Sequence, residues 1–398
     1  MEIKKRKYYF KKIKPFINKQ LIKVITGQRR SGKSYFLYQI MDEIKNLFPD
    51  KTLIYIDKEK MEFDTVKDYK DLVQYAEKHK GNSQTAAIFI DEVQEIKEFE
   101  RALRHLLSTG NWDIYITGSN ADMLSSELAT LLSGRYIAIE MFPLSYPEFL
   151  YFHNLQDNAE NFRKYIIFGG MPYLYNLPLS EEIAFEYLQN ITNTILFKDV
   201  VARYKIRDID FLENLVGYLA ANTGNLISAK RISDYLKSQK LKFNHNTVMD
   251  YLNYISKAFL THRIKRFDIQ GKRIMEIGEK DYFTDTGIRN SITGYNDNDI
   301  ALIFENLVFN HLKRKNNKVY IGKFKDKEID FVAFEKNQPV YIQVTLSLAS
   351  PDVKAREIGN LLLLKDNYRK IVITGDEYTS DQQGVEVINI REFLMGVN

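Results

Sequence analysis

Short apolar runs alternate with amphipathic stretches between Leu21 and Glu140. Five of these runs have the length of a strand, and they lie at Leu21–Thr26, Thr52–Ile56, Ala86–Ile90, Ile114–Thr117 and Tyr136–Ile139. Helical patterns separate them, which is typical of buried parallel strands joined by helices. The pattern therefore predicts an α/β fold with a parallel sheet flanked by helices.

The rest of the chain divides into three further parts. Residues 146–207 are mostly helical, with a turn signal at Phe168–Pro172. Three short helical patterns, the second opening at Ser228–Ile232, and a strand follow up to Phe267, which suits a helix-turn-helix with a wing. An α/β pattern then returns, with a helix at Ile303–Lys313 and strands from Lys318 onward. We expect modules at residues 1–145, 146–208, 209–268 and 269–398.

Composition narrows the class of protein. In 398 residues, 44% hydrophobic and 27% charged positions exclude wholesale disorder, and the absence of cysteine excludes disulfide and thiolate chemistry. No apolar run approaches the ~20 residues that span a bilayer, so we expect a cytoplasmic protein without a membrane partner. The net charge of +5 is too small to indicate nucleic acid by itself. The basic stretch Lys4–Lys7 can contact a phosphate backbone, or it is a solvated arm before the first strand.

The strongest motif is Gly27-Gln28-Arg29-Arg30-Ser31-Gly32-Lys33-Ser34, which matches G-x-x-x-x-G-K-[ST] between an apolar strand and an amphipathic helix. Glycines let the backbone approach phosphate oxygens, and the helix N-terminus favours an anion. Lys33 is expected to reach the β- and γ-phosphates, and the Ser34 hydroxyl to complete an Mg²⁺ shell. We predict nucleotide binding by residues 27–34 and Tyr35. The sequence leaves open whether Arg29 and Arg30 contact phosphate or an acidic partner.

Further polar residues follow three of the expected strands. Asp91 ends an apolar run and is placed to hold Mg²⁺, and Glu92 is placed to act as the base for water. Asn120 or Ser119, after the next strand, senses the γ-phosphate or caps the following helix. Arg135 supplies charge to the transition state, in cis or to a neighbouring copy, or forms an ordinary salt bridge. Among these we predict catalytic roles for Lys33, Glu92, Asn120 and Arg135, and metal binding by Ser34 and Asp91.

These residues, together with several other stretches of the chain, resemble a known protein family. Besides the phosphate loop, the resemblance covers Ile90–Gln94, Thr117–Ser119, Leu132–Arg135, Met141–Phe149, Phe168–Pro172 and Lys280–Gly287. The chain resembles the AAA-type (STAND-like) P-loop ATPases of bacteria and archaea. The resemblance implies ATP as the nucleotide, and a core fused to a winged helix and to a C-terminal domain similar to restriction endonucleases.

The C-terminal modules suggest partners. The recognition helix at Asn246–Lys257 is poor in arginine, so the basic wing at Arg263–Arg273 is the better candidate for DNA contact. A nuclease of the restriction type needs a helical Glu, a strand Asp, and an acid-x-Lys. Glu305 and Asp330 fit, but Gln343 and Thr345 replace the other two groups. We therefore expect a nuclease-like fold without nuclease activity.

The sequence thus predicts a Mg²⁺-dependent ATPase whose nucleotide state controls its winged-helix and C-terminal modules. Two alternatives stay open: an ATP-gated DNA nuclease, and a nucleotide-responsive DNA-binding protein without significant turnover. Beyond ATP, the partners left open are DNA, a second copy of the chain and another protein.

Overall fold

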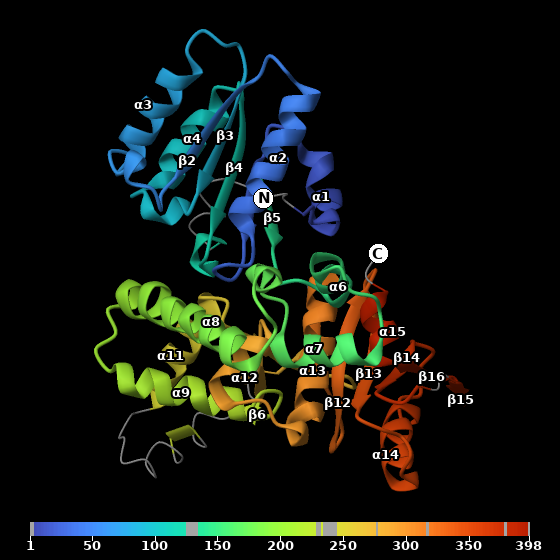
Figure 1. Cartoon of the computed structure of the whole chain (residues 1–398). Helices are drawn as coiled ribbons and strands as arrows, with labels where there is room; N and C mark the ends of the chain where they lie inside the picture. Colours follow the sequence, from blue (N-terminus) through green and yellow to red (C-terminus); the bar gives the residue numbers. More distant parts are fainter. Residues whose placement is uncertain are drawn as a thin grey trace. The chain divides into compact units, whose positions relative to one another are not determined.

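The computed structural model describes residues 4–124, 134–227, 232–233, 245–275, 278–315, 318–377 and 380–396 (Figure 1). The chain divides into two compact units, residues 1–142 with 257–259, and residues 143–256 with 260–398. Within the described ranges, no helix combines the length and the apolar character that crossing a bilayer requires.

The first unit is built on a five-stranded parallel sheet with the strand order β2-β3-β4-β1-β5. Its strands are β1 (Ile22–Thr26), β2 (Thr52–Asp57), β3 (Ala86–Asp91), β4 (Trp112–Gly118) and β5 (Tyr136–Glu140). All five predicted runs are confirmed as strands. Because the strands are parallel, their carboxyl ends meet at one edge of the sheet, and that edge carries the predicted phosphate loop.

Helices cover both faces of this sheet (Figure 1). They are α1 (Lys7–Ile13), α2 (Lys33–Leu47), α3 (Tyr69–Lys80) and α4 (Phe99–Ser108), with short 3₁₀ helices η1 (Lys14–Phe16), η2 (Met61–Phe63), η3 (Val93–Glu95) and η4 (Ala121–Leu124). Successive strand residues point to opposite faces. Val24 and Ile88 therefore pack with α3 and α4, whereas Ile25 and Phe89 pack with α1 and α2.

The second unit contains many helices besides those that accompany its C-terminal sheet. They are α6 (Tyr146–His153), α7 (Ala159–Phe168), η5 (Pro172–Asn176), α8 (Glu181–Thr194), the π-helix η6 (Ile195–Ala202), α9 (Ile209–Ala221), α11 (His245–Lys257), α12 (Thr286–Thr293) and η7 (Asp297–Asp299). A capping box starts α6, in which the Ser145 hydroxyl accepts from the Glu148 amide and the Glu148 carboxylate accepts from the Ser145 amide. The helical character predicted for residues 146–207 is confirmed.

A small sheet follows, with the order β6-β10-β7 for β6 (Leu226–Ile227), β10 (Glu279–Phe283) and β7 (Thr261–Ile264). The strand pairing crosses the module boundary expected at residue 268. Strand β10 lies beyond that boundary, and β8 (Arg266–Asp268) before it joins the C-terminal sheet by pairing with β11 (Val319–Phe324). Of the helix predicted to open at Ser228, residues 228–231 lie outside the described residues.

The C-terminal sheet has eight strands in the order β15-β16-β14-β13-β12-β11-β8-β9. Its other members are β9 (Arg273–Ile274), β12 (Lys327–Glu335), β13 (Gln338–Thr345), β14 (Lys370–Thr374), β15 (Ser380–Gln382) and β16 (Val385–Asn389), with helices α13 (Ile300–Lys315), α14 (Pro351–Leu362) and α15 (Ile390–Met395). From α13 the order is helix, three antiparallel strands, helix, and a strand parallel to β13.

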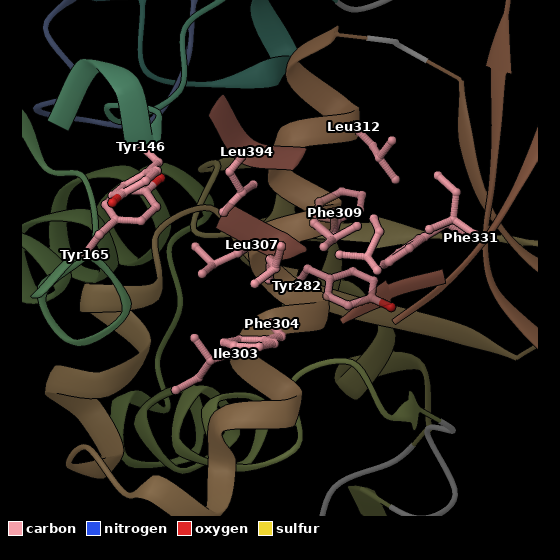
Figure 2. Close-up of a cluster of buried hydrophobic side chains, with 14 of the residues drawn as sticks. Tyr146, Tyr165, Tyr282, Ile303, Phe304, Leu307, Phe309, Leu312, Phe331 and Leu394 are labelled. Atoms are coloured by element: carbon pink, nitrogen blue, oxygen red, sulfur yellow. The ribbon is translucent and has the colours of Figure 1, made fainter. Parts of the chain in front are cut away.

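Helix α13 runs through the main core of the second unit (Figure 2). Ten of its sixteen residues are buried. The ring of Phe309 stacks on Tyr282 of β10, with centroids 4.6 Å apart, and lies 6.2 Å from Phe331 of β12. The small sheet and the C-terminal sheet therefore share one apolar core rather than two.

Candidate nucleotide site

The phosphate loop joins β1 to α2, and its conformation requires its two glycines. Gly27 has φ +141° and Gly32 has φ +97°, values that residues with a side chain rarely adopt. A Cβ atom on Gly27 would lie 2.1 Å from the Met141 carbonyl oxygen. The Lys33 ammonium is buried inside the loop and donates to the carbonyls of Gly27 (3.0 Å) and Gln28 (3.1 Å).

Several buried polar atoms beside this loop lack a hydrogen-bond partner within the described protein. They are the hydroxyl oxygens of Thr26 and Ser31 and both amide atoms of Gln28. Buried polar groups in proteins are almost always paired. A set of three unpaired side chains next to a buried ammonium and a helix N-terminus fits a polar, anionic ligand such as a nucleoside triphosphate.

The two arginines of the loop differ. Arg29 is buried and its Nη1 donates to the Glu59 carboxylate at 2.7 Å, whereas Arg30 is exposed. Arg29 therefore pairs with an acid of its own unit, which the sequence did not reveal. Tyr35 is half exposed, and its ring contacts Tyr38 edge-on.

Asp91 ends β3 beside the phosphate loop. It accepts hydrogen bonds from the Thr117 hydroxyl and, at 3.3 Å, from the Tyr55 hydroxyl. Burial raises the pKa of Asp91, against the opposing effect of hydrogen bonds from Ser34 and Thr117. The predicted Mg²⁺ ligands Ser34 and Asp91 thus meet, and a hydroxyl and a carboxylate are oxygen donors of the kind that Mg²⁺ prefers.

Glu92 is the next residue and lies nearly buried with a positive φ of 54°. Its carboxylate accepts from the Ser119 hydroxyl at 3.0 Å and from the Gln94 amide, and it lies 3.9 Å from the Lys33 ammonium. Burial raises the pKa of Glu92, but Lys33, Arg29 and these hydrogen bonds outweigh burial and hold the pKa below its usual value. Glu92 is therefore an ionised carboxylate at neutral pH.

The other two predicted catalytic residues are Asn120 and Arg135. Asn120 is buried and its side-chain oxygen accepts from the Asp122 amide at 2.7 Å, which is the cap arrangement, while Ser119 makes the contact with Glu92. Arg135 is exposed and precedes β5, whose first residue pairs with Ile22. The loop follows the far end of β1, about 13 Å along the sheet at ~3.3 Å per residue.

This placement does not bring Arg135 to the phosphate loop of its own chain. A role toward a neighbouring copy stays a prediction, and Leu132 and Ser133 of the same motif lie outside the described residues. The sequence missed Thr117, Gln94 and Tyr55 as neighbours of the two acids. Thr117 and Gln94 could have been found, because both lie in the stretches that carry the resemblance, but Tyr55 carried no signal.

Two motifs of the second unit that the sequence singled out contact each other. The Asp285 carboxylate accepts from the Gly170 amide at 2.7 Å and from the Ile288 amide at 3.0 Å. A Cβ atom on Gly287 would lie 2.0 Å from the Phe168 carbonyl oxygen. The motifs Phe168–Pro172 and Lys280–Gly287 therefore form a close-packed junction between the helical part and α12.

The nuclease-like positions form a cluster in which one lysine pairs with two acids. The Lys280 ammonium from β10 lies 2.9 Å from the carboxylates of both Glu305 and Glu328. Gln343 accepts from the Asp330 amide and donates to the Glu357 carboxylate, each at 2.7 Å. No group of three or more His, Asp or Glu side chains in the described ranges is arranged to hold a metal ion.

The basic wing is largely paired with acids of its own unit. Arg263 lies 3.0 Å from Glu279, and Arg266 lies 3.5 Å from Glu328. Arg273 lies 3.7 Å from Asp268. These contacts reduce the positive charge that the wing offers to a phosphate backbone. Lys240 and Lys242, near the recognition helix, lie outside the described residues.

Comparisons with known proteins identify the type of domain that contains the phosphate loop. Residues 19–150 match a family described as an AAA domain, and residues 159–299 match a domain of unknown function. An uncharacterized protein of Haemophilus influenzae is 35% identical over 98% of both chains. Uncharacterized protein MJ1544 of Methanocaldococcus jannaschii is 33% identical over 93% of this chain and 85% of its own.

Solved structures are more distant. AMPPCP-bound DnaA from Aquifex aeolicus is 16% identical with a TM-score of 0.32, covering 62% of this chain and 86% of its own. The Aeropyrum pernix Orc1 protein in complex with DNA is 10% identical with a TM-score of 0.33, covering 72% and 90%.

Proposed function

The chain belongs to the family of the Haemophilus influenzae protein and its archaeal relative and carries an AAA-type P-loop ATPase domain, and on this premise we propose that it is a Mg²⁺-dependent ATPase. Its nucleotide state would control the winged-helix and C-terminal modules of the second unit. The observation that carries the proposal is the convergence of Lys33, which follows β1, with Asp91 and Glu92 at the end of β3. Thr117 and Ser119, at the end of the intervening strand β4, hold the two acids.

Each of these residues has a distinct part in hydrolysis. Lys33 neutralises charge on the β- and γ-phosphates, once its ammonium exchanges loop carbonyls for phosphate oxygens. Ser34 and Asp91 would hold Mg²⁺, which supplies further positive charge to the phosphates. Glu92 is ionised and takes the proton of the attacking water, while Ser119 and Gln94 fix the direction of its carboxylate.

Two substitutions test this assignment. Lys33→Ala should abolish tight ATP binding. Glu92→Gln should retain binding but lower the turnover rate by about 10²–10⁴-fold, because a general base contributes that much. Glu95→Gln is the matched control, since Glu95 is an exposed acid three residues further on. If the Glu92→Gln variant hydrolysed ATP at the rate of the unsubstituted protein, the role of Glu92 as general base would be contradicted.

For the C-terminal module we propose a restriction-endonuclease-like fold without cleavage activity. The element order from α13 to β14 supports the fold, and Glu305 and Asp330 occupy the expected helix and strand. Lys280 forms ion pairs with Glu305 and Glu328, and Gln343 hydrogen-bonds to the Asp330 amide and the Glu357 carboxylate. Incubation with plasmid, Mg²⁺ or Mn²⁺ and ATP tests this proposal. DNA cleavage that Asp330→Ala abolishes would overturn it.

A further inference from the structure

Arg6, from the basic stretch at the start of the chain, is buried rather than solvated. Its Nη1 donates to the carbonyl of Ser31 in the phosphate loop at 3.1 Å, and its Nη2 donates to the carbonyl of Phe142 at 3.0 Å. The side-chain amide of Gln39 on α2 fixes the neighbouring backbone, because its oxygen accepts from the Arg6 amide and its nitrogen donates to the Lys4 carbonyl. One guanidinium therefore joins the phosphate loop to the last residue of the first unit.

The segment that ends at Phe142 also contacts the loop directly. The Met141 amide donates to the Thr26 carbonyl at 2.7 Å, immediately before the loop. Gly27 lies so close to Met141 that a Cβ atom would overlap its carbonyl. The Phe142 amide donates to the Tyr9 hydroxyl at 2.9 Å. The start of the phosphate loop is thus fastened directly to Met141, and Ser31 is joined to Phe142 through Arg6.

In the second unit an arginine donates to the backbone carbonyl that follows that of Phe142 along the chain. Arg314 of α13 is buried, and its Nη2 donates to the Pro143 carbonyl at 2.8 Å. The Leu144 amide then donates to the Gly170 carbonyl at 2.6 Å, in the junction of the two motifs. Successive carbonyls, those of Phe142 and Pro143, are therefore each held by a buried guanidinium, one belonging to each unit.

We propose that Arg6 and Arg314 form a coupling clamp on the connecting segment, through which nucleotide binding in the phosphate loop reaches the second unit. This inference rests on the proposed ATP binding. Phosphate binding reorients the peptide groups of the loop, the Ser31 peptide among them, because their N–H groups turn toward the anion. Arg6 transmits a shift of the Ser31 carbonyl to Phe142, since a planar guanidinium holds both acceptors in fixed geometry. Arg314 relays a displacement of Pro143 to α13, the central helix of the second unit.

Hydrogen exchange of backbone amides, with and without ATP and Mg²⁺, measures this coupling. The full chain would carry Glu92→Gln so that ATP persists. In that protein ATP should slow exchange at residues 28–36 and change exchange at residues 144–153. The Arg314→Gln variant should bind ATP with an affinity within about twofold of the parent's. ATP should still slow exchange at residues 28–36 of this variant, but exchange at residues 144–153 should no longer change. Arg6→Gln should lose the same response and bind ATP about tenfold more weakly, because a charged hydrogen bond to the loop is removed.

Controls separate coupling from folding. Lys7→Gln removes an exposed charge from the residue next to Arg6 and should leave both responses intact. Arg6→Lys and Arg314→Lys keep the charge with a single donor group and should restore part of the response. No protection of residues 28–36 in the parent would overturn both ATP binding and the clamp. Protection of the loop together with a full response at 144–153 in Arg314→Gln would overturn the clamp alone.

Discussion

The substitution Gly27→Ala tests which of two constraints requires a glycine at the start of the phosphate loop. One constraint is access of the backbone to phosphate oxygens, and the other is packing of the loop on residue 141. The distance of 2.1 Å between a Cβ atom and the Met141 carbonyl oxygen predicts that packing alone forbids a side chain. The variant should therefore destabilise the first unit even without nucleotide.

The magnitude follows from two contributions. Backbone at φ +141° is strained for alanine, which costs roughly 1–3 kcal/mol. Relieving the overlap with Met141 requires a backbone shift, which costs another 1–3 kcal/mol or so. The sum is about 4 kcal/mol. Gly110→Ala is the matched control, because Gly110 has φ +78° but its Cβ would meet nothing closer than 3.7 Å. Strain alone then costs about 1–2 kcal/mol.

Thermal unfolding without nucleotide, followed by ATP titration, measures both effects. At about 2–4 °C per kcal/mol, Gly27→Ala should lower the midpoint of the first unit by about 10 °C, and Gly110→Ala by about 4 °C. ATP binding should fall only in Gly27→Ala. A midpoint for Gly27→Ala equal to that of Gly110→Ala, with ATP binding lost, would refute the packing argument.

Two further predictions concern buried charges. Burial raises the pKa of Asp281 to about 6, so the folded state binds this proton more tightly than the unfolded state does. The resulting stabilisation is complete below pH ~4 and is lost as pH rises through 6. Urea unfolding should therefore show a loss of about 3 kcal/mol between pH 4 and 7 relative to Asp281→Asn, and parallel pH profiles would contradict this. Asp113→Asn should cost about 3–5 kcal/mol, because it keeps an acceptor for Tyr115 but leaves buried Lys23 without its counter-charge. Adding Lys23→Met should recover most of this loss in the same assay, and an equally unstable double variant would exclude the ion pair as the cause.

Local patterns were sufficient for much of the fold and part of the site. Each of the five strands in the first unit is a run of adjacent apolar residues, so its position can be found without knowing its partners. The phosphate loop is likewise a local motif, and its glycines define its backbone. The positions of Asp91 and Glu92 can be predicted from the end of a single apolar run. For these residues the sequence needed only short-range information.

Other placements depended on pairing between distant segments. Ser119 contacts Glu92 because β4 lies next to β3 in the sheet. Arg135 lies at the far edge because β5 pairs with β1 from its first residue. The sequence pattern around Ser119 or Arg135 does not indicate which strands pair there. The strand pairing across residue 268 could not be foreseen for the same reason, since β8 pairs with a strand more than 50 residues later.

Local periodicity and spacing encode the parallel α/β core, the phosphate loop and the two acids after β3, so these features can be derived from the sequence. The burial of Arg6 between the phosphate loop and Phe142, and the ion pair of Lys280 with Glu305, became visible only in the folded chain. A charged residue in a polar stretch has the pattern of a solvated side chain. Its burial depends on acceptors that folding brings from more than 20 residues away, which hydrophobic periodicity does not encode.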